Sequence, residues 1–166
     1  MEGAGMQLSI LNKYKENTRI EAKQAVGGLP HSIWETYSAF ANTSGGVILL
    51  GVAENKKEKN LYPVELPDPS RLVAQFWELI NDKRVVSANI LKKSDVTIEC
   101  VEGKEIVVIC VRKAKRCERP IYIGNNPKTG AYYRDGEADL RFTEEQVLQL
   151  MEEAKLPKEV RSKKIK

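Results

Sequence analysis

The side chains best suited to chemistry are five cations gathered in one short stretch, residues 112–119, the basic segment. It contains only one acidic residue, Glu118, so its net charge is +4. Such a cluster can contact phosphate groups, with salt-dependent affinity and no base specificity. Lys128 and Arg134 follow in the next predicted loop and strand and can extend it. The candidate nucleic-acid-binding residues are Arg112, Lys113, Lys115, Arg116, Arg119, Lys128 and Arg134.

Three tyrosines lie close to the basic segment in the sequence, Tyr122, Tyr132 and Tyr133. They could stack on the exposed bases of a single strand. Aromatic strand residues more often pack against the protein, and a run of charges is often only a solvated surface. The sequence leaves both interpretations open.

The net charge of +4 is unevenly distributed along the chain. Residues 155–166 carry a net charge of +5, so the rest of the chain carries −1. This excludes a globally basic nucleic-acid binder and leaves a locally basic one. A single histidine and three cysteines without CxxC spacing argue against disulfides, zinc and histidine-based catalysis. Without a signal segment or an apolar run of about 20 residues, the sequence predicts a cytoplasmic protein that does not contact membranes.

Residues 32–52 must provide the core on which these side chains are positioned. Apolar residues at helical spacing predict a helix that begins at Ser32, with Glu35 completing a capping box. Residues 42–46 predict a tight turn, and the run VILLGV predicts a central strand covered on both faces.

The remaining elements follow from the same kind of pattern. Helices are expected to begin at Asp68-Pro69 and at Thr143, which forms a capping box with Gln146. Strands are expected at residues 19–26, 62–66, 85–91, 96–101, 106–111, 120–123 and 131–134. The pattern predicts the α+β class, with a mixed β-sheet of about five to seven strands and three or four helices. We expect one domain over residues 6–154, and a basic tail or linker over 155–166 that leads to a missing C-terminal region.

Four pieces of the sequence occur in a recognisable order: ENTRIEAK, SAFANTSGGVILLGV, RPIYIGNN with AYYRDG, and the closing helix after Thr143. Together they resemble the Schlafen-type Alba-like (AlbA_2) domain, a DNA-binding family found in bacterial transcriptional regulators. The resemblance implies a module that binds nucleic acid, chiefly double-stranded DNA. It would do so by non-specific phosphate contacts from the basic segment, without a metal or other cofactor.

Animal Schlafen relatives include RNA endonucleases that use three carboxylates, and the resemblance therefore implies an alternative. Glu16 and Glu21 match the first two carboxylates in spacing. For the third, the family commonly has Gly-Val-Asp, where this chain has GVAE over residues 51–54. The alternative is a metal-dependent endoribonuclease with catalytic residues Glu16, Glu21 and Glu54 and a bound Mg²⁺ or Mn²⁺. If Ala53 took the third position, the set of ligands would be broken.

A third function class is a dimerisation or sensor module, in which an exposed sheet edge forms a homodimer. Trp77 or Tyr62 could lie at that interface, although Trp77 also suits the core. Of the three, only the nuclease is an enzyme. The arrangement of the charges distinguishes nucleic-acid binding from nuclease activity. If the carboxylates and the basic segment share one groove, the nuclease is favoured; if they lie on separate faces, binding is favoured.

Overall fold

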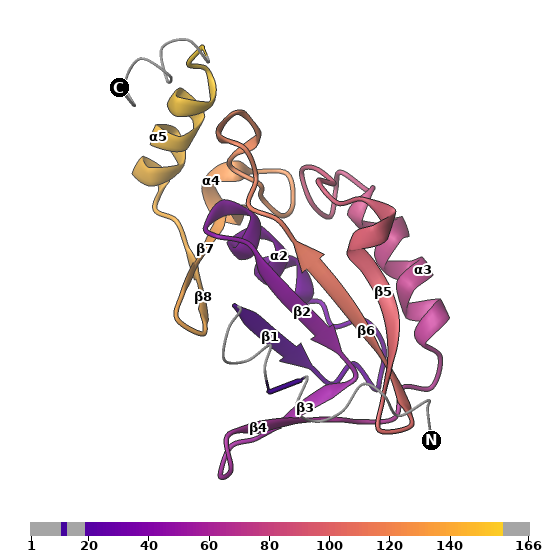
Figure 1. Cartoon of the computed structure of the whole chain (residues 1–166). Helices are drawn as coiled ribbons and strands as arrows, with labels where there is room; N and C mark the ends of the chain where they lie inside the picture. The colour runs from indigo at the N-terminus through magenta and orange to yellow at the C-terminus, as the bar shows by residue number, and fades with distance from the viewer. Residues whose placement is uncertain (1–10, 13–18, 158–166) are drawn as a thin grey trace.

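The computed structural model describes residues 11–12 and 19–157. Its centre is a four-stranded sheet in the order β1-β2-β6-β5 (Figure 1). β1 runs parallel to β2, whereas β2 with β6 and β6 with β5 are antiparallel. The bounds are β1 Ile20–Lys23, β2 Gly46–Leu50, β5 Val96–Val101 and β6 Lys104–Val111. The strands predicted at residues 96–101 and 106–111 are confirmed as β5 and β6, which form a hairpin with Glu102 and Gly103 at positive φ in its turn.

Two further hairpins lie apart from this sheet. One pairs β3 (Val52–Asn55) with β4 (Asn60–Pro63), and the other pairs β7 (Tyr132–Asp135) with β8 (Ala138–Arg141). The described helices are α2 Ile33–Asn42, α3 Pro69–Ile80, α4 Pro127–Gly130 and α5 Glu144–Ala154, with 3₁₀ turns at Lys93–Asp95 (η2) and Arg116–Glu118 (η3). The α+β class is confirmed, with the strands divided among three sheets.

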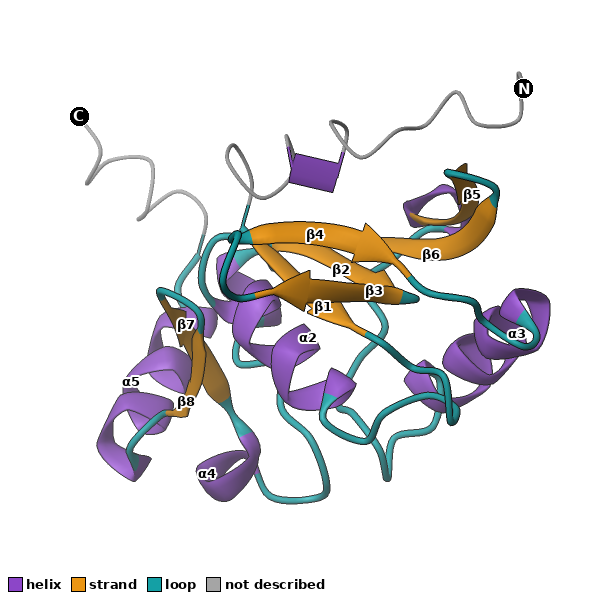
Figure 2. Cartoon of the chain, turned by 90° about the horizontal axis from the view of Figure 1, so that it is seen from below, coloured by secondary structure: helices purple, strands orange, loops and turns teal. Residues whose placement is uncertain are grey.

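Both faces of the central sheet are covered. Helices α2 and α3 pack on one face and the β3–β4 hairpin on the other (Figure 2). Along β2, Ile48 and Leu50 face the helices, while Val47 and Leu49 face the hairpin. This explains the continuous apolar run, because a strand buried on both faces has no polar side. Within the described part of the chain, no helix is long and apolar enough to span a membrane.

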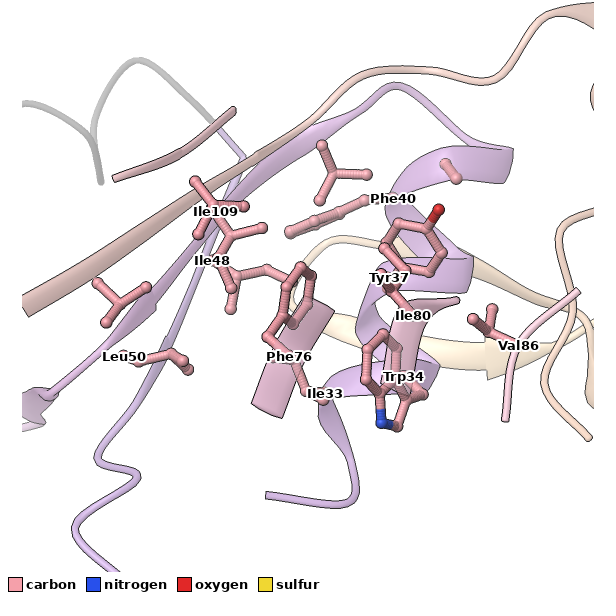
Figure 3. Close-up of a cluster of buried hydrophobic side chains, with 14 of the residues drawn as sticks. Ile33, Trp34, Tyr37, Phe40, Ile48, Leu50, Phe76, Ile80, Val86 and Ile109 are labelled. Carbon is pink, nitrogen blue, oxygen red and sulfur yellow. The ribbon is translucent and has the colours of Figure 1, made fainter. Parts of the chain in front are cut away.

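The larger core lies between α2, α3 and the sheet (Figure 3). Trp34 of α2 stacks on Phe76 of α3 with ring centroids 5.2 Å apart. Tyr37 is fully buried, and its hydroxyl donates to the Ala88 carbonyl and accepts from the Ile90 amide. Burial raises the pKa of Tyr37 to about 12, with the hydrogen bond from Ile90 acting weakly in the opposite direction.

Helix α2 also buries polar side chains, which attach the late part of the chain to it. The Asn42 amide donates to the carbonyls of Ile121 and Tyr132 and accepts from the Ile121 amide. Ser38 donates to the Ile121 carbonyl and accepts from the Tyr132 amide. These bonds satisfy the buried groups and hold the segment that leads into β7.

The capping box predicted at Ser32 is wrong. Its backbone is already in the helical region, and its hydroxyl accepts from Lys23 Nζ instead of capping the helix. The preceding residues start the turn, because the Ile33 amide already bonds to the Pro30 carbonyl. The caps at Asp68 and at Thr143 with Gln146 are confirmed.

The strand predicted at residues 85–91 is also wrong. Only an isolated bridge between Val86 and Ile123 forms there. The segment is held by single bonds, such as those to the Tyr37 hydroxyl and from the Ser87 amide to the Tyr122 carbonyl. Its apolar residues fill the core from a loop, and apolar composition alone does not distinguish such a loop from a strand.

Candidate functional site

The basic segment follows the end of β6 and turns through η3. Lys113 and Lys115 are exposed. Arg112 makes a two-pronged pair with Glu118, with both nitrogen–oxygen distances 3.0 Å. The hydrogen bond between them raises the pKa of Arg112 and lowers the pKa of Glu118. The Arg112 Nε also donates to the Ile90 carbonyl, which fixes the side chain at its base.

Arg116, another cation of the segment, is used within the protein. Arg116 donates to the backbone carbonyls of Glu153 and Leu156 at the end of α5, the latter at 2.8 Å. A cation at this position also opposes the partial negative charge of the helix C-terminus. Arg119 is half-buried. Lys128, in α4, lies 3.3 Å from Glu144 of α5. The Arg116 contacts support the packing of α5, whereas the Lys128–Glu144 pair lies at the surface, with side chains 47% and 63% exposed.

Arg134 is separated from the other candidate cations. Its side chain is only 2% exposed, and its guanidinium bridges Glu21 at 2.8 Å and Asp139 at 2.6 Å. It also donates to the carbonyls of Gly136 and Ile20. Burial works against the charge, but the hydrogen bonds to the two carboxylates outweigh it and raise the pKa of Arg134. An arginine committed in this way does not face a duplex backbone.

The contacts of Arg134 belong to a longer chain of polar groups. Asp139 accepts from the Thr36 hydroxyl at 2.7 Å. On the other side, Lys23 Nζ lies 3.7 Å from the Glu21 carboxylate and donates to Ser32. This series of polar contacts therefore joins β1, β7 and β8 to the N-terminal part of α2. It fixes the Glu21 carboxylate relative to the scaffold.

Glu21 opens onto a cleft of about 410 Å³ at the outer edge of β1. The cleft lies between the β3–β4 and β7–β8 hairpins, which contribute Lys56 and Glu137 to its walls. Its lining residues are Arg19, Ile20, Glu21, Ala22, Glu54, Lys56, Leu61, Arg134, Gly136 and Glu137. Cations and carboxylates are equal in number on these walls, so the cleft is polar without a dominant sign.

The third candidate carboxylate, Glu54, is in the same cleft as Glu21. Gly51 has a φ of 87° and packs against Leu66, so the chain leaves β2 there and begins β3 in a new direction. Ala53 is consequently buried at 3% exposure, and Glu54 is exposed toward the cleft. Glu54, and not position 53, therefore presents the third candidate carboxylate to the cleft. Glu16 lies outside the described residues.

The carboxylates and the basic segment form separate surfaces. The cations that line the cleft are Arg19, Lys56 and Arg134, and none of them belongs to residues 112–119. Among residues 11–12 and 19–157, no group of three or more Asp, Glu, His or Cys side chains has the geometry of a metal site. A two-carboxylate site remains open to Mg²⁺, which is often held by one or two carboxylates and substrate phosphates.

Comparison with protein-family models matches residues 16–143 to the family described as Schlafen, AlbA_2. The chain belongs to this family. The Schlafen AlbA_2 domain is also similar to the solution NMR structure of the N-terminal domain of an "ATP-dependent DNA helicase RecG-related protein" from Nitrosomonas europaea. That domain is 32% identical, with a TM-score of 0.57, and the similarity covers 85% of this chain and 93% of that one.

A protein from Corynebacterium diphtheriae of known crystal structure is 19% identical, with a TM-score of 0.48. The similarity covers 77% of this chain and 22% of that one. No curated protein matches the chain.

Sequence reasoning missed three charged residues that line the cleft of this Schlafen AlbA_2 domain: Arg19, Lys56 and Glu137. Residues 55–60 form the tip of the β3–β4 hairpin. Its proximity to β1 depends on the redirection at Gly51, which the continuous apolar run VILLGV conceals. A signal was present in the unusual density of lysines, three in residues 56–59.

Three of the aromatic candidates, Tyr132, Tyr133 and Trp77, pack within the protein. Tyr132 is buried, and Tyr133 packs against Phe142 with ring centroids 5.0 Å apart. Trp77 packs edge-on against Phe76, while Tyr62 is 43% exposed on β4. Tyr132 and Tyr133 therefore support the β7–β8 region and are poorly placed to stack on bases.

Proposed function

We propose that this domain binds double-stranded DNA through non-specific contacts between the basic segment and phosphates. The observation that carries the proposal is the projection of Lys113 and Lys115 into solvent beside Arg112 at the end of β6. The family and the neighbouring helicase-related domain support a nucleic-acid-related role. We further propose that the domain acts within a cytoplasmic bacterial transcriptional regulator.

The Arg112–Glu118 pair does not prevent this role. Its side chains are 39% and 29% exposed. Pairs of this kind contribute about 0–1 kcal/mol, so a phosphate can replace the carboxylate at low cost. Arg116 instead holds the segment against the end of α5. The proposed contacts are therefore Arg112, Lys113 and Lys115.

The test is charge reversal at the two exposed lysines, K113E/K115E, compared with R71E/K104E. The control changes the same net charge at the first turn of α3 and at the start of β6, away from the basic segment. We expect K113E/K115E to weaken binding of a labelled duplex about 10-fold or more at low salt, equally for unrelated sequences. Equal affinities for the two double variants would contradict the proposed contact surface.

A second candidate function is metal-dependent endoribonuclease activity, favoured by the location of Glu21 and Glu54 in one cleft. Carboxylate oxygens suit Mg²⁺ or Mn²⁺, and such an ion would stabilise charge on a phosphate under attack by water. In this function Arg134 would orient Glu21, and Lys56 would hold a flanking phosphate.

This candidate predicts Mn²⁺- or Mg²⁺-dependent cleavage of structured RNA. E21Q and E54Q should each abolish cleavage, while E137Q, on the opposite wall, should retain it. Circular dichroism of E21Q would show whether the variant keeps its fold, because Glu21 also pairs with Arg134. No cleavage of transfer RNA and single-stranded RNA with either metal would remove this candidate.

A further inference from the structure

The cleft beside β1 continues over the β3–β4 hairpin. A second hollow, of about 310 Å³, is lined by Glu54, Lys56, Lys59 and Glu137. Three of these residues also line the first cleft, so the two hollows form one groove. The groove runs from the outer edge of β1 toward the tip of the hairpin. An elongated groove suits a chain-like ligand better than a compact one.

The tip of this hairpin is a hydrogen-bonded turn that carries cations. The Asn55 side-chain oxygen accepts from the amides of Lys57 and Glu58, at 3.1 and 3.2 Å. The turn carries Lys56, Lys57 and Lys59 against Glu58 alone. Leu61 anchors the hairpin in the core beneath, with 1% exposure. The lysines are therefore held on an ordered element, where phosphate contacts require less ordering.

The size of the cleft suits a nucleotide of a single strand. A cleft of about 410 Å³ is in the range of small-ligand sites, about 300–1,000 Å³. A cleft of this size can admit a nucleotide of a single strand. Among the described residues that line it, none is aromatic, so the groove offers no surface for base stacking. Recognition must therefore rest on the sugar-phosphate backbone.

We infer that this groove is a binding path for single-stranded nucleic acid, in which Lys56, Lys57 and Arg19 contact phosphates. The inference rests on the proposed nucleic-acid binding and adds a surface separate from the basic segment. Arg134 neutralises part of the charge of Glu21 on the floor of the cleft, which reduces repulsion of the strand. Arg19 and Lys56 lie at the cleft, and Lys57 extends the contact at the hairpin tip.

The test compares three variants on a labelled single-stranded oligonucleotide of mixed sequence: K56Q/K57Q, K113E/K115E and R71E/K104E. We expect K56Q/K57Q to weaken single-strand binding about 3- to 10-fold. The slope of log K against log salt should fall in magnitude by about 1.4, since each single-strand phosphate contact contributes about 0.7. Duplex binding by K56Q/K57Q should match that of the wild-type protein.

The outcomes separate this inference from the proposed function. If K56Q/K57Q binds the single strand as tightly as wild type while K113E/K115E loses duplex binding, the groove inference is overturned and the proposed function stands. If the wild-type protein binds neither form of nucleic acid, both fail. Acetylation of the lysines of the wild-type protein, with and without a bound single strand, tests the same inference without variants. A bound single strand should protect Lys57 and leave Lys104 reactive, and equal modification of Lys57 with and without the strand would also overturn the inference.

Discussion

The Arg134 guanidinium lies 2.8 Å from the Glu21 carboxylate, although the two residues are 113 positions apart in the chain. This pair joins β7 to the edge strand β1 and sets the position of Glu21 in the cleft. Asp139 on the adjacent strand holds the other side of the guanidinium. Arg134 thus takes a positioning role between the late hairpin and the cleft.

Replacing Arg134 by Met should destabilise the domain strongly. The substitution leaves Glu21 and Asp139 without their buried cation, and breaking a buried pair from one side costs about 3–5 kcal/mol. Urea unfolding measures the change in the free energy of unfolding. Arg134→Lys should lose less, because it keeps the charge but not the planar fork.

The matched control for Arg134 is Arg84→Met. Arg84 also pairs with an aspartate, Asp82, but its side chain is 85% exposed. This variant should unfold at the same urea concentration as wild type. Equal losses for the two arginine variants would show that the buried network does not stabilise the fold.

Tyr37 should give the domain an alkaline sensitivity. Its pKa is raised from 10.0 to about 12 by burial, so the folded state favours the neutral phenol. The resulting stabilisation is complete below pH 10 and is lost as the pH rises toward 12, by up to about 3 kcal/mol. The difference in unfolding free energy between wild type and Y37F should therefore narrow over this interval. A difference independent of pH would show that Tyr37 titrates alike in both states.

Local signals in the sequence predicted most of the framework. The helix that begins at Asp68-Pro69 and the β5–β6 hairpin have caps and turns that are encoded within a few residues. The failures at Ser32 and at residues 85–91 arose where tertiary contacts decided the structure. Ser32 binds Lys23, and the 85–91 loop is held by Tyr37 and Tyr122.

The candidate sites were less predictable, because side-chain direction and long-range pairing determine them. In the sequence, Arg134 looks like any arginine that could bind a phosphate. Only the positions of Glu21 and Asp139 in the structure show that its guanidinium is enclosed. Buried Ser38 and Asn42, four residues apart on a helix, were a usable signal for a hydrogen-bonded partner segment. Glu54 could not be assigned to the cleft without the change of direction at Gly51.

Glu118→Gln should strengthen duplex binding. The amide can still accept from the Lys115 backbone, so the turn is retained, but it releases Arg112 from its carboxylate partner. We expect the affinity for a duplex to rise about 2- to 5-fold at low salt, since one negative charge is removed from the contact surface. Fluorescence anisotropy provides the measurement, with Glu78→Gln on the exposed face of α3 as the control. Weaker binding by E118Q than by E78Q would contradict the role of Arg112.

The salt dependence of duplex binding tests the central claim most directly. Contacts from Arg112, Lys113 and Lys115 to three phosphates predict a slope of log K against log salt of about −2.7 for the wild-type protein, because each contact to a duplex contributes about −0.9. The slope should be the same for unrelated sequences. In K113E/K115E its magnitude should fall to about 1 or less. A wild-type slope near zero, or one that K113E/K115E leaves unchanged, would contradict phosphate binding by the basic segment.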